Sequence, residues 1–341
     1  MTQPGRSCPL RYRYRPEVFA RDATLHAETL YVIGGLYGNV ESLRQLLVMR
    51  RDEEQRSGGR VELLFNGDFN WFDCDAESFS EINETVLRHA AIQGNVEAEL
   101  DSAGEENGCG CNYPDHVEQA VVERSNAIMR RLRECAADFP ALQRRLGALP
   151  MYCTVEVGGQ VIGVVHGDPE SLSGWRFAWE AMPALAGESL EPTGLTSTQR
   201  ASHASVADDF RRAGVSAFAS THTCLPFVQD IQVDGQRHLV INNGAAGMPN
   251  FKGTSFGVLT RISSRISSRS ETPGDSLYGT TLNGLRFDAL PIRYDQAGWM
   301  HRFLSNWPAG SPAHTAYFNR ITEGPEFTVP QAVRLAGGLS S

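Results

Sequence analysis

Short apolar runs alternate with polar, glycine-rich turns along much of the chain. The runs are rich in Val, Ile, Leu and Phe, which is typical of buried strands. The runs predicted to form strands are 30–33, 61–65, 91–92, 153–157, 161–165, 215–219, 239–241, 256–261 and 285–294. Apolar positions at helical spacing predict helices over 40–47 and 117–132, and a further helix is expected over 295–307.

Several of these runs end abruptly in a turn that carries Asp, Asn or His beside glycine. One such turn means little, because Gly, Asn and Asp favour turns for conformational reasons. A succession of them favours a functional site, because α/β proteins gather their ligands at the carboxyl ends of strands. We therefore expect the side chains that follow these strands to meet.

Composition narrows the function classes without naming one. The chain has 341 residues, 41% of them hydrophobic and 21% charged, which indicates a globular protein and not a disordered one. A net charge of −9 argues against a nucleic-acid or anionic-membrane partner. The sequence contains neither a spanning segment nor a signal peptide, so a cytoplasmic location is expected. The seven cysteines are expected to be free thiols or metal ligands rather than disulfides.

Five short motifs occur in a fixed order along residues 30–261. They are Gly35-Leu36-Tyr37-Gly38-Asn39, Gly67-Asp68-Phe69-Asn70, Gly94-Asn95-Val96-Glu97, His166-Gly167 and Thr221-His222-Thr223-Cys224-Leu225-Pro226. In this order and spacing the sequence resembles the calcineurin-like metallophosphoesterases. The resemblance implies an α/β fold, a four-layer α-β-β-α sandwich whose ligands lie on loops at strand ends.

The resemblance also suggests how the chain is divided. Residues 1–29 would form an N-terminal extension, and residues 30–261 the metallophosphoesterase-like core. Within that core, 171–205 would be an insertion that forms a lid over the site. Residues 262–341 would be a C-terminal extension that completes the sheet.

One of the two metal sites of that family keeps its ligands in this sequence. The resemblance implies that Asp68, Asn95, His166 and His222 bind one metal, with Asp68, Asn95 and His166 also catalytic. Two imidazoles, a carboxylate and an amide oxygen suit Mn, Fe, Co, Ni or Zn. We therefore expect one divalent transition metal as the cofactor.

The other metal site is altered. By the same resemblance, its ligand positions are Gly35, Tyr37, Asp68 and Cys224. Tyr37 and Cys224 form a candidate altered first-metal site, through a phenolate and a thiolate. Gly35 removes an anionic ligand, so the alternative is that the second metal is lost, Tyr37 packs over the loop and Cys224 is a spare thiol.

Three further features bear on the chemistry. Cys109-Gly110-Cys111 is either a soft-metal or redox motif or a tight turn with two free thiols. Trp175, Arg176 and Trp179 either line a substrate pocket or pack in the core and lid. Val96 stands where the family has a histidine that protonates the leaving group. Unless His116 or a lid residue supplies that proton, the substrate needs a good leaving group, such as an anhydride or aryl ester.

Two functions of different class follow from these residues. The first is a divergent metal-dependent hydrolase that uses one retained metal to activate water against a phosphate ester or anhydride. Its partner would be a small phosphorylated substrate or a phosphoprotein. The second is a catalytically impaired pseudo-phosphoesterase that acts as a binding or regulatory module. The sequence does not predict an oligomeric state.

Overall fold

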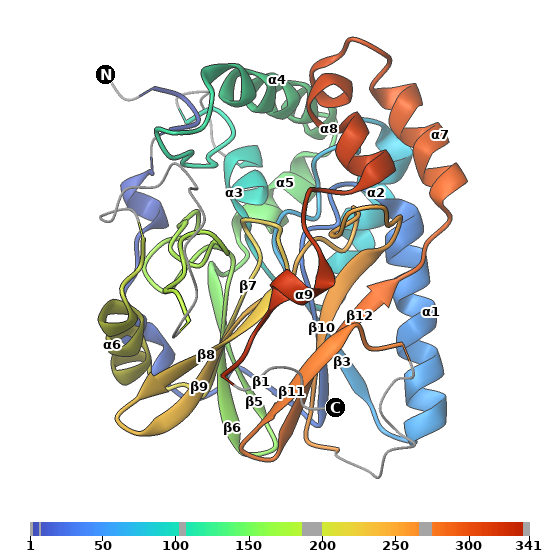
Figure 1. The fold of residues 1–341 in the computed structure, drawn as a ribbon. Helices are drawn as coiled ribbons and strands as arrows, with labels where there is room; N and C mark the ends of the chain where they lie inside the picture. Colours follow the sequence, from blue (N-terminus) through green and yellow to red (C-terminus); the bar gives the residue numbers. More distant parts are fainter. Residues whose placement is uncertain (1–2, 7, 102–106, 186–199, 266–274, 337–341) are drawn as a thin grey trace.

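The computed structural model describes residues 3–6, 8–101, 107–185, 200–265 and 275–336. Two mixed β-sheets pack face to face, and helices cover their outer faces, so the α-β-β-α sandwich expected from the sequence is confirmed (Figure 1). Helix α1 (Val40–Ser57) lies along one side of the pair of sheets and α6 (His203–Ala213) along the other.

The two sheets are built from segments that are far apart in sequence. Among the described residues, one sheet has the order β1 (Leu25–Ala27), β5 (Tyr152–Val157), β6 (Gln160–Val165), β7 (Ala217–Ser220), β9 (Gln236–Asn242), β8 (Phe227–Val233) and β13 (Val333–Arg334). The other has the order β11 (Tyr278–Leu282), β12 (Leu285–Ile292), β10 (Gly257–Ser263), β2 (Thr29–Ile33), β3 (Val61–Asn66) and β4 (Ala90–Ile92).

The remaining helices lie around and above these sheets. They are η1 (Leu10–Tyr12), η2 (Pro16–Phe19), α2 (Ala76–Val86), α3 (Asn95–Leu100), α4 (Gln119–Ala136), α5 (Pro140–Gly147), α7 (Gln296–Asn306), α8 (Pro312–Glu323) and α9 (Val329–Ala332). Figure 1 shows α4, α7 and α8 together over one end of the sheets. None of the described helices is long and apolar enough to cross a lipid bilayer.

The strand β2 shows why the apolar runs have no polar face. Leu30 and Val32 join the hydrophobic core between the sheets, whereas Tyr31 and Ile33 join the core under the helices. Successive side chains of a strand point to opposite faces, so a strand covered on both faces must be apolar throughout. Full burial of such side chains stabilises the fold by roughly 1.5–3 kcal/mol each.

Strand directions bring the predicted turns to common edges. Strands β2, β3 and β4 are mutually parallel, and so are β6, β7 and β9 in the other sheet. Parallel strands place their carboxyl ends at one edge. The loops that follow β3, β4, β6 and β7 therefore meet, as expected from the sequence.

Within the segment 171–205, predicted as a lid, only some of the described residues lie near the site. Its residues 186–199 lie outside the described residues. In the described part, Phe177 and Met182 are buried, and Phe177 packs against Phe218 of β7 with ring centroids 5.7 Å apart. Much of the described segment therefore covers the seven-stranded sheet, and only the stretch around Trp175 reaches the site.

Candidate metal centre

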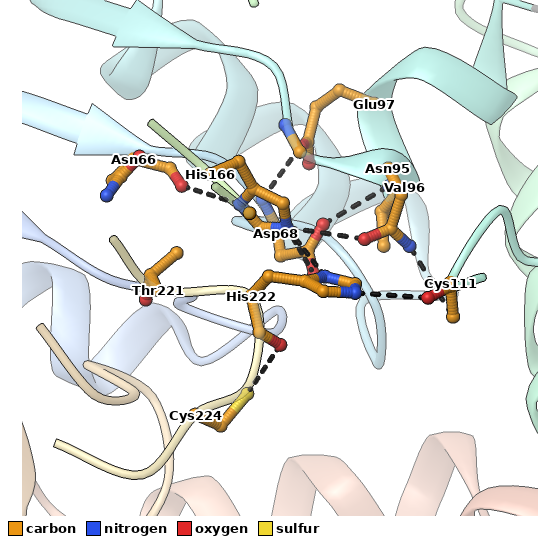
Figure 2. A network of polar contacts seen from close by, with 12 residues as sticks. Asn66, Asp68, Asn95, Val96, Glu97, Cys111, His166, Thr221, His222 and Cys224 are labelled. Carbon is orange, nitrogen blue, oxygen red and sulfur yellow. Dashed lines mark hydrogen bonds and ion pairs between the residues drawn. The ribbon is translucent and has the colours of Figure 1, made fainter. Parts of the chain in front are cut away.

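Four polar side chains converge where the strand-end loops meet. Asp68 follows β3, Asn95 begins α3, and His166 and His222 follow β6 and β7. One ligand atom from each of Asp68, His166 and His222 lies within 4.8 Å of the others. Figure 2 shows the carboxylate, the amide and the two imidazoles facing one another.

Backbone carbonyls fix the tautomer of each histidine. Nδ1 of His166 donates to the carbonyl of Asn66 at 2.8 Å, and Nε2 of His222 donates to the carbonyl of Cys111 at 3.1 Å. The opposite ring nitrogens are therefore unprotonated in the neutral imidazoles. These two nitrogens, Nε2 of His166 and Nδ1 of His222, are 3.2 Å apart. Two lone pairs at that distance repel unless a proton or a metal ion lies between them.

The oxygen ligands are oriented in the same manner. Asn95 donates its amide Nδ2 to the carbonyl of Cys109 at 2.9 Å, which turns Oδ1 toward Nε2 of His166 at 3.2 Å. Asp68 accepts from the Val96 amide through Oδ1 at 3.2 Å, and its Oδ2 lies 3.3 Å from the same imidazole nitrogen. Both oxygens therefore lie beside the same imidazole nitrogen.

The spacing of these atoms fits a divalent transition metal. Bonds of about 2.1 Å place neighbouring ligands about 3.0–3.4 Å apart, in octahedral or tetrahedral geometry. The observed separations of 3.2–3.3 Å fall within this range. Carboxylate, amide and imidazole donors suit Mn, Fe, Co, Ni or Zn alike, so the donor set does not identify the ion.

Asp68 and His166 form an electrostatic pair in the buried cluster. Burial and the neighbouring His166 lower the pKa of His222 to about 4, so this imidazole is neutral at physiological pH. Burial opposes charge on His166, but the Asp68 carboxylate outweighs burial and raises the pKa of His166. Burial alone would raise the pKa of Asp68, yet His166 holds it below its usual value. The cluster therefore presents an ionised carboxylate to a cation.

Glu97 holds two of the ligand loops together. Its buried carboxylate accepts from the backbone amides of Asp68 and Gly94 at 2.8 and 2.9 Å, and from the side chain of Asn70 at 3.1 Å. Burial, followed by the charge of Asp68, raises the pKa of Glu97 to about 7. The sequence motif contained Glu97 but did not predict this positioning role.

A tyrosine ring fills the position implied for the other metal. An ideal Cβ at Gly35 would lie 2.8 Å from the Tyr37 hydroxyl oxygen and closer still to two ring carbons. The hydroxyl meets the Cys224 sulfur at 2.6 Å. Burial, then Cys224 and Asp68, raises the pKa of Tyr37 well above its usual value, and burial also raises the pKa of Cys224. The phenol and thiol are therefore neutral and contact each other, which favours loss of this metal.

Backbone strain is concentrated at the same loops. Tyr37, Asp68 and Cys224 have φ values of 53°, 53° and 61°, a region that side chains rarely adopt. Each such residue costs roughly 1–3 kcal/mol and persists only where the surroundings hold it. The loops are joined by hydrogen bonds, among them Tyr37 N to Asp68 O at 3.1 Å. Strain at three facing residues indicates a functional site.

Comparison with known proteins agrees with this architecture. Neither a family model nor a curated protein sequence matches the chain. Among solved structures, a hypothetical protein of Pyrococcus horikoshii aligns over 87% of this chain and 99% of its own, with a TM-score of 0.55 and 14% identity. A metallophosphoesterase of Sphaerobacter thermophilus aligns over 88% and 100%, with a TM-score of 0.50 and 15% identity.

This chain has a metallophosphoesterase fold. The likeness to the Sphaerobacter thermophilus metallophosphoesterase, together with the two packed sheets, confirms the resemblance of the sequence at the level of the fold. It does not identify a ligand or an activity. The assignment of Asp68, Asn95, His166 and His222 as metal ligands therefore stays a prediction, and it is supported by their geometry alone.

The Cys109-Gly110-Cys111 turn supports the candidate metal centre through its backbone. The carbonyls of Cys109 and Cys111 accept from Asn95 and His222, as described above. Cys111 also accepts from the indole nitrogen of Trp175 at 2.9 Å. Burial raises the pKa of the Cys111 thiol well above its usual value. The geometry favours the interpretation of a tight turn with two thiols, and this turn orients two predicted ligands.

A cavity of about 150 Å³ opens beside the cluster. Its wall contains Asp68, His222 and several aromatic side chains, among them Trp71, Tyr113, Trp175 and Tyr317. Trp175 packs edge-on against His222 with ring centroids 5.3 Å apart. The structure therefore places the first of the three predicted pocket residues at the site.

The other two predicted pocket residues lie elsewhere. Arg176 pairs with Glu170 and Asp209, and Trp179 packs against Phe327. Neither lines the cavity, because each is held by partners outside it. His116 is exposed and does not line the cavity either.

Two cavity residues come from a segment without a recognisable motif. Tyr317 and Arg320 lie one turn apart on α8, and both border the cavity. Their spacing on one helix face is visible in the sequence. What the sequence lacks is any signal that α8 crosses the ends of strands more than 90 residues away.

Proposed function

We propose that the chain is a metal-dependent hydrolase of phosphate esters that uses one divalent transition metal. The observation that carries this proposal is the convergence of four side chains: Nδ1 of His222 and the Asp68 and Asn95 oxygens all lie 3.2–3.3 Å from Nε2 of His166. A buried carboxylate that faces imidazole nitrogens and an amide oxygen is an arrangement that a metal cation stabilises.

Each residue of the cluster has a task in that reaction. Asp68, Asn95, His166 and His222 would hold the ion. When bound, the ion supplies Lewis-acid activation of water and of a phosphoryl oxygen. The carbonyls of Asn66 and Cys111 keep the two imidazoles in the ligating tautomer, and Glu97 fixes the loops of Asp68 and Asn95.

The leaving group must depart without an imidazole acid. Val96 offers no proton, and among the described residues that line the cavity the only imidazole is that of His222, whose N–H is bonded to Cys111. General-acid help from an imidazole of the cavity wall, typically about 10²–10⁴-fold, is therefore absent among the described residues. This supports a substrate with a good leaving group, and the aromatic wall of Trp71, Tyr113 and Trp175 favours an aryl ester over an anhydride.

A catalytically impaired binding module is the second candidate. It is favoured by the cavity volume of about 150 Å³, smaller than the roughly 300–1,000 Å³ of ordinary ligand pockets, and by the ring of Tyr37 at the other metal position. The small cavity also supports a small phosphorylated molecule over a phosphoprotein as the partner. Location in the cytoplasm stays a prediction.

The experiment that separates the candidates measures turnover of p-nitrophenyl phosphate and of an alkyl phosphate in the presence of Mn²⁺, Ni²⁺, Co²⁺, Zn²⁺ or Fe²⁺. The hydrolase proposal expects turnover of the aryl ester that exceeds turnover of the alkyl ester. It also expects His166→Ala to abolish turnover, while the exposed control His301→Ala retains it. Absence of turnover with every ion supports the binding module.

A further inference from the structure

Arg320 is a cavity residue whose charge has no carboxylate partner in the described part of the chain. Among the described residues it forms no ion pair, and its Nη2 donates only to the backbone carbonyl of Cys224 at 3.2 Å. Its Nε is buried and has no hydrogen-bond partner in the described structure. By contrast, the part-buried arginines Arg133 and Arg176 both pair with carboxylates. An uncompensated guanidinium beside a cavity indicates an anionic ligand.

A second observation points to the same ligand. Trp71 also borders the cavity, and its indole Nε1 is a buried donor that has no partner among the described residues. Buried donors are almost always paired, so two unpaired donors at one small cavity need an explanation. A ligand rich in acceptor oxygens would satisfy both of them.

The position of Arg320 relates it to the altered metal site. It binds the carbonyl of Cys224, and the sulfur of Cys224 meets the Tyr37 hydroxyl where the resemblance implies the first metal. Because the Tyr37 ring occupies the space beside Gly35, this side of the cavity holds a side chain where the resemblance implies a positively charged metal ion. A guanidinium restores one positive charge there, and its planar donors match phosphoryl oxygens.

We propose that Arg320 binds the phosphoryl group of the substrate in place of the missing first metal. The proposal rests on the proposed function for the identity of the group, a phosphomonoester dianion. The guanidinium would hold phosphoryl oxygens beside Cys224, and Asp68 and His222 border the same cavity. A helix of the C-terminal segment thereby contributes to the site what the strand-end loops no longer supply.

The test measures binding of inorganic phosphate by isothermal titration calorimetry to the purified full-length protein, without any turnover. Hydrogen bonds to charged groups predict that Arg320→Gln weakens phosphate binding about 10–100-fold. Arg320→Lys retains the charge and is expected to recover part of the loss. Arg130→Gln, which removes an exposed charge on α4, is expected to leave phosphate binding unchanged.

A second readout separates anion binding from a structural role. With p-nitrophenyl phosphate, Arg320→Gln is expected to raise KM by a similar factor, while urea unfolding stays within the range of Arg130→Gln. If Arg320→Gln does not fold, the comparison of Arg320→Lys with the wild type takes its place. Lysine lacks the planar fork, so a Kd and KM equal to those of the wild type would overturn the proposal.

Two results would contradict the role of Arg320 and leave the proposed hydrolase function in place. One is an Arg320→Gln protein that binds phosphate as tightly as the wild type. The other is a wild-type protein that hydrolyses esters in a His166-dependent manner but does not bind phosphate. Conversely, phosphate binding that depends on Arg320 in a protein without turnover would support the inference and refute the hydrolase.

Discussion

The packing of Tyr37 against Gly35 can be tested with a double-mutant cycle. An added Cβ at position 35 would lie 2.8 Å from the Tyr37 hydroxyl oxygen and closer to its ring carbons. The ring cannot move aside easily, because Tyr37 is only 5% exposed and its hydroxyl contacts Cys224. The backbone itself would accept alanine, because Gly35 is not among the glycines with positive φ.

The magnitudes follow from this geometry. Overpacking of a buried site by one methyl group costs about 1–3 kcal/mol, so Gly35→Ala should lower the free energy of unfolding by that amount. Tyr37→Ala alone should cost about 3 kcal/mol through loss of the buried ring. In the Tyr37→Ala background, however, Gly35→Ala should cost less than about 0.5 kcal/mol, because the new methyl group enters the vacated space.

The assay is urea unfolding of the wild type, the two single variants and the double variant, followed by tryptophan fluorescence. The expected coupling between positions 35 and 37 is about 1–3 kcal/mol, with the double variant more stable than additivity predicts. Effects that add within about 0.5 kcal/mol would refute the packing of the ring into this position.

Three further predictions concern stability and metal binding. Burial raises the pKa of Asp73 to about 7, so the folded protein keeps a proton that the unfolded chain releases above about pH 4. Wild-type stability should therefore fall from pH 4 to 7 by on the order of 4 kcal/mol relative to Asp73→Asn, as urea titrations at several pH values would measure. Arg261 pairs with two buried carboxylates, so Arg261→Ala should lower the free energy of unfolding by about 3–5 kcal/mol, measured in urea at pH 7. The triple variant Gly35→Asp, Tyr37→His, Cys224→His should bind two metal ions per chain by elemental analysis, and a count of one would contradict the implied first-metal position.

The strands were predictable because burial on both faces requires an uninterrupted run of apolar residues. Residues 30–33 and 61–65 are apolar at every position except Glu62, and each ends where the chain leaves the sheet. Strand β8 (Phe227–Val233) was missed, because its polar residues Gln229, Asp230 and Gln232 interrupt the apolar run. The predicted strands 239–241 and 256–261 are present as β9 and β10, with shifted ends.

The site was predictable only where residues follow strands in sequence. Asp68, His166 and His222 each come within two residues of a strand end. They meet because the carboxyl ends of parallel strands lie at the same edge of a sheet. The role of Arg320 required the path of α8, which depends on tertiary packing and not on local pattern. The ring of Tyr37 at the metal position and the carbonyls of Cys109 and Cys111 likewise depend on side-chain and loop conformations that spacing does not encode.

The count of bound metal ions per chain tests the central claim most directly. Protein purified and reconstituted separately with Mn²⁺, Co²⁺, Ni²⁺, Zn²⁺ and, without oxygen, Fe²⁺ would be dialysed and measured by elemental analysis beside Asp68→Asn and the exposed control His301→Ala. We predict about one ion per chain for the wild type and for His301→Ala, and little or none for Asp68→Asn. Two ions per wild-type chain, none with any of these ions, or one ion that Asp68→Asn retains, would contradict it.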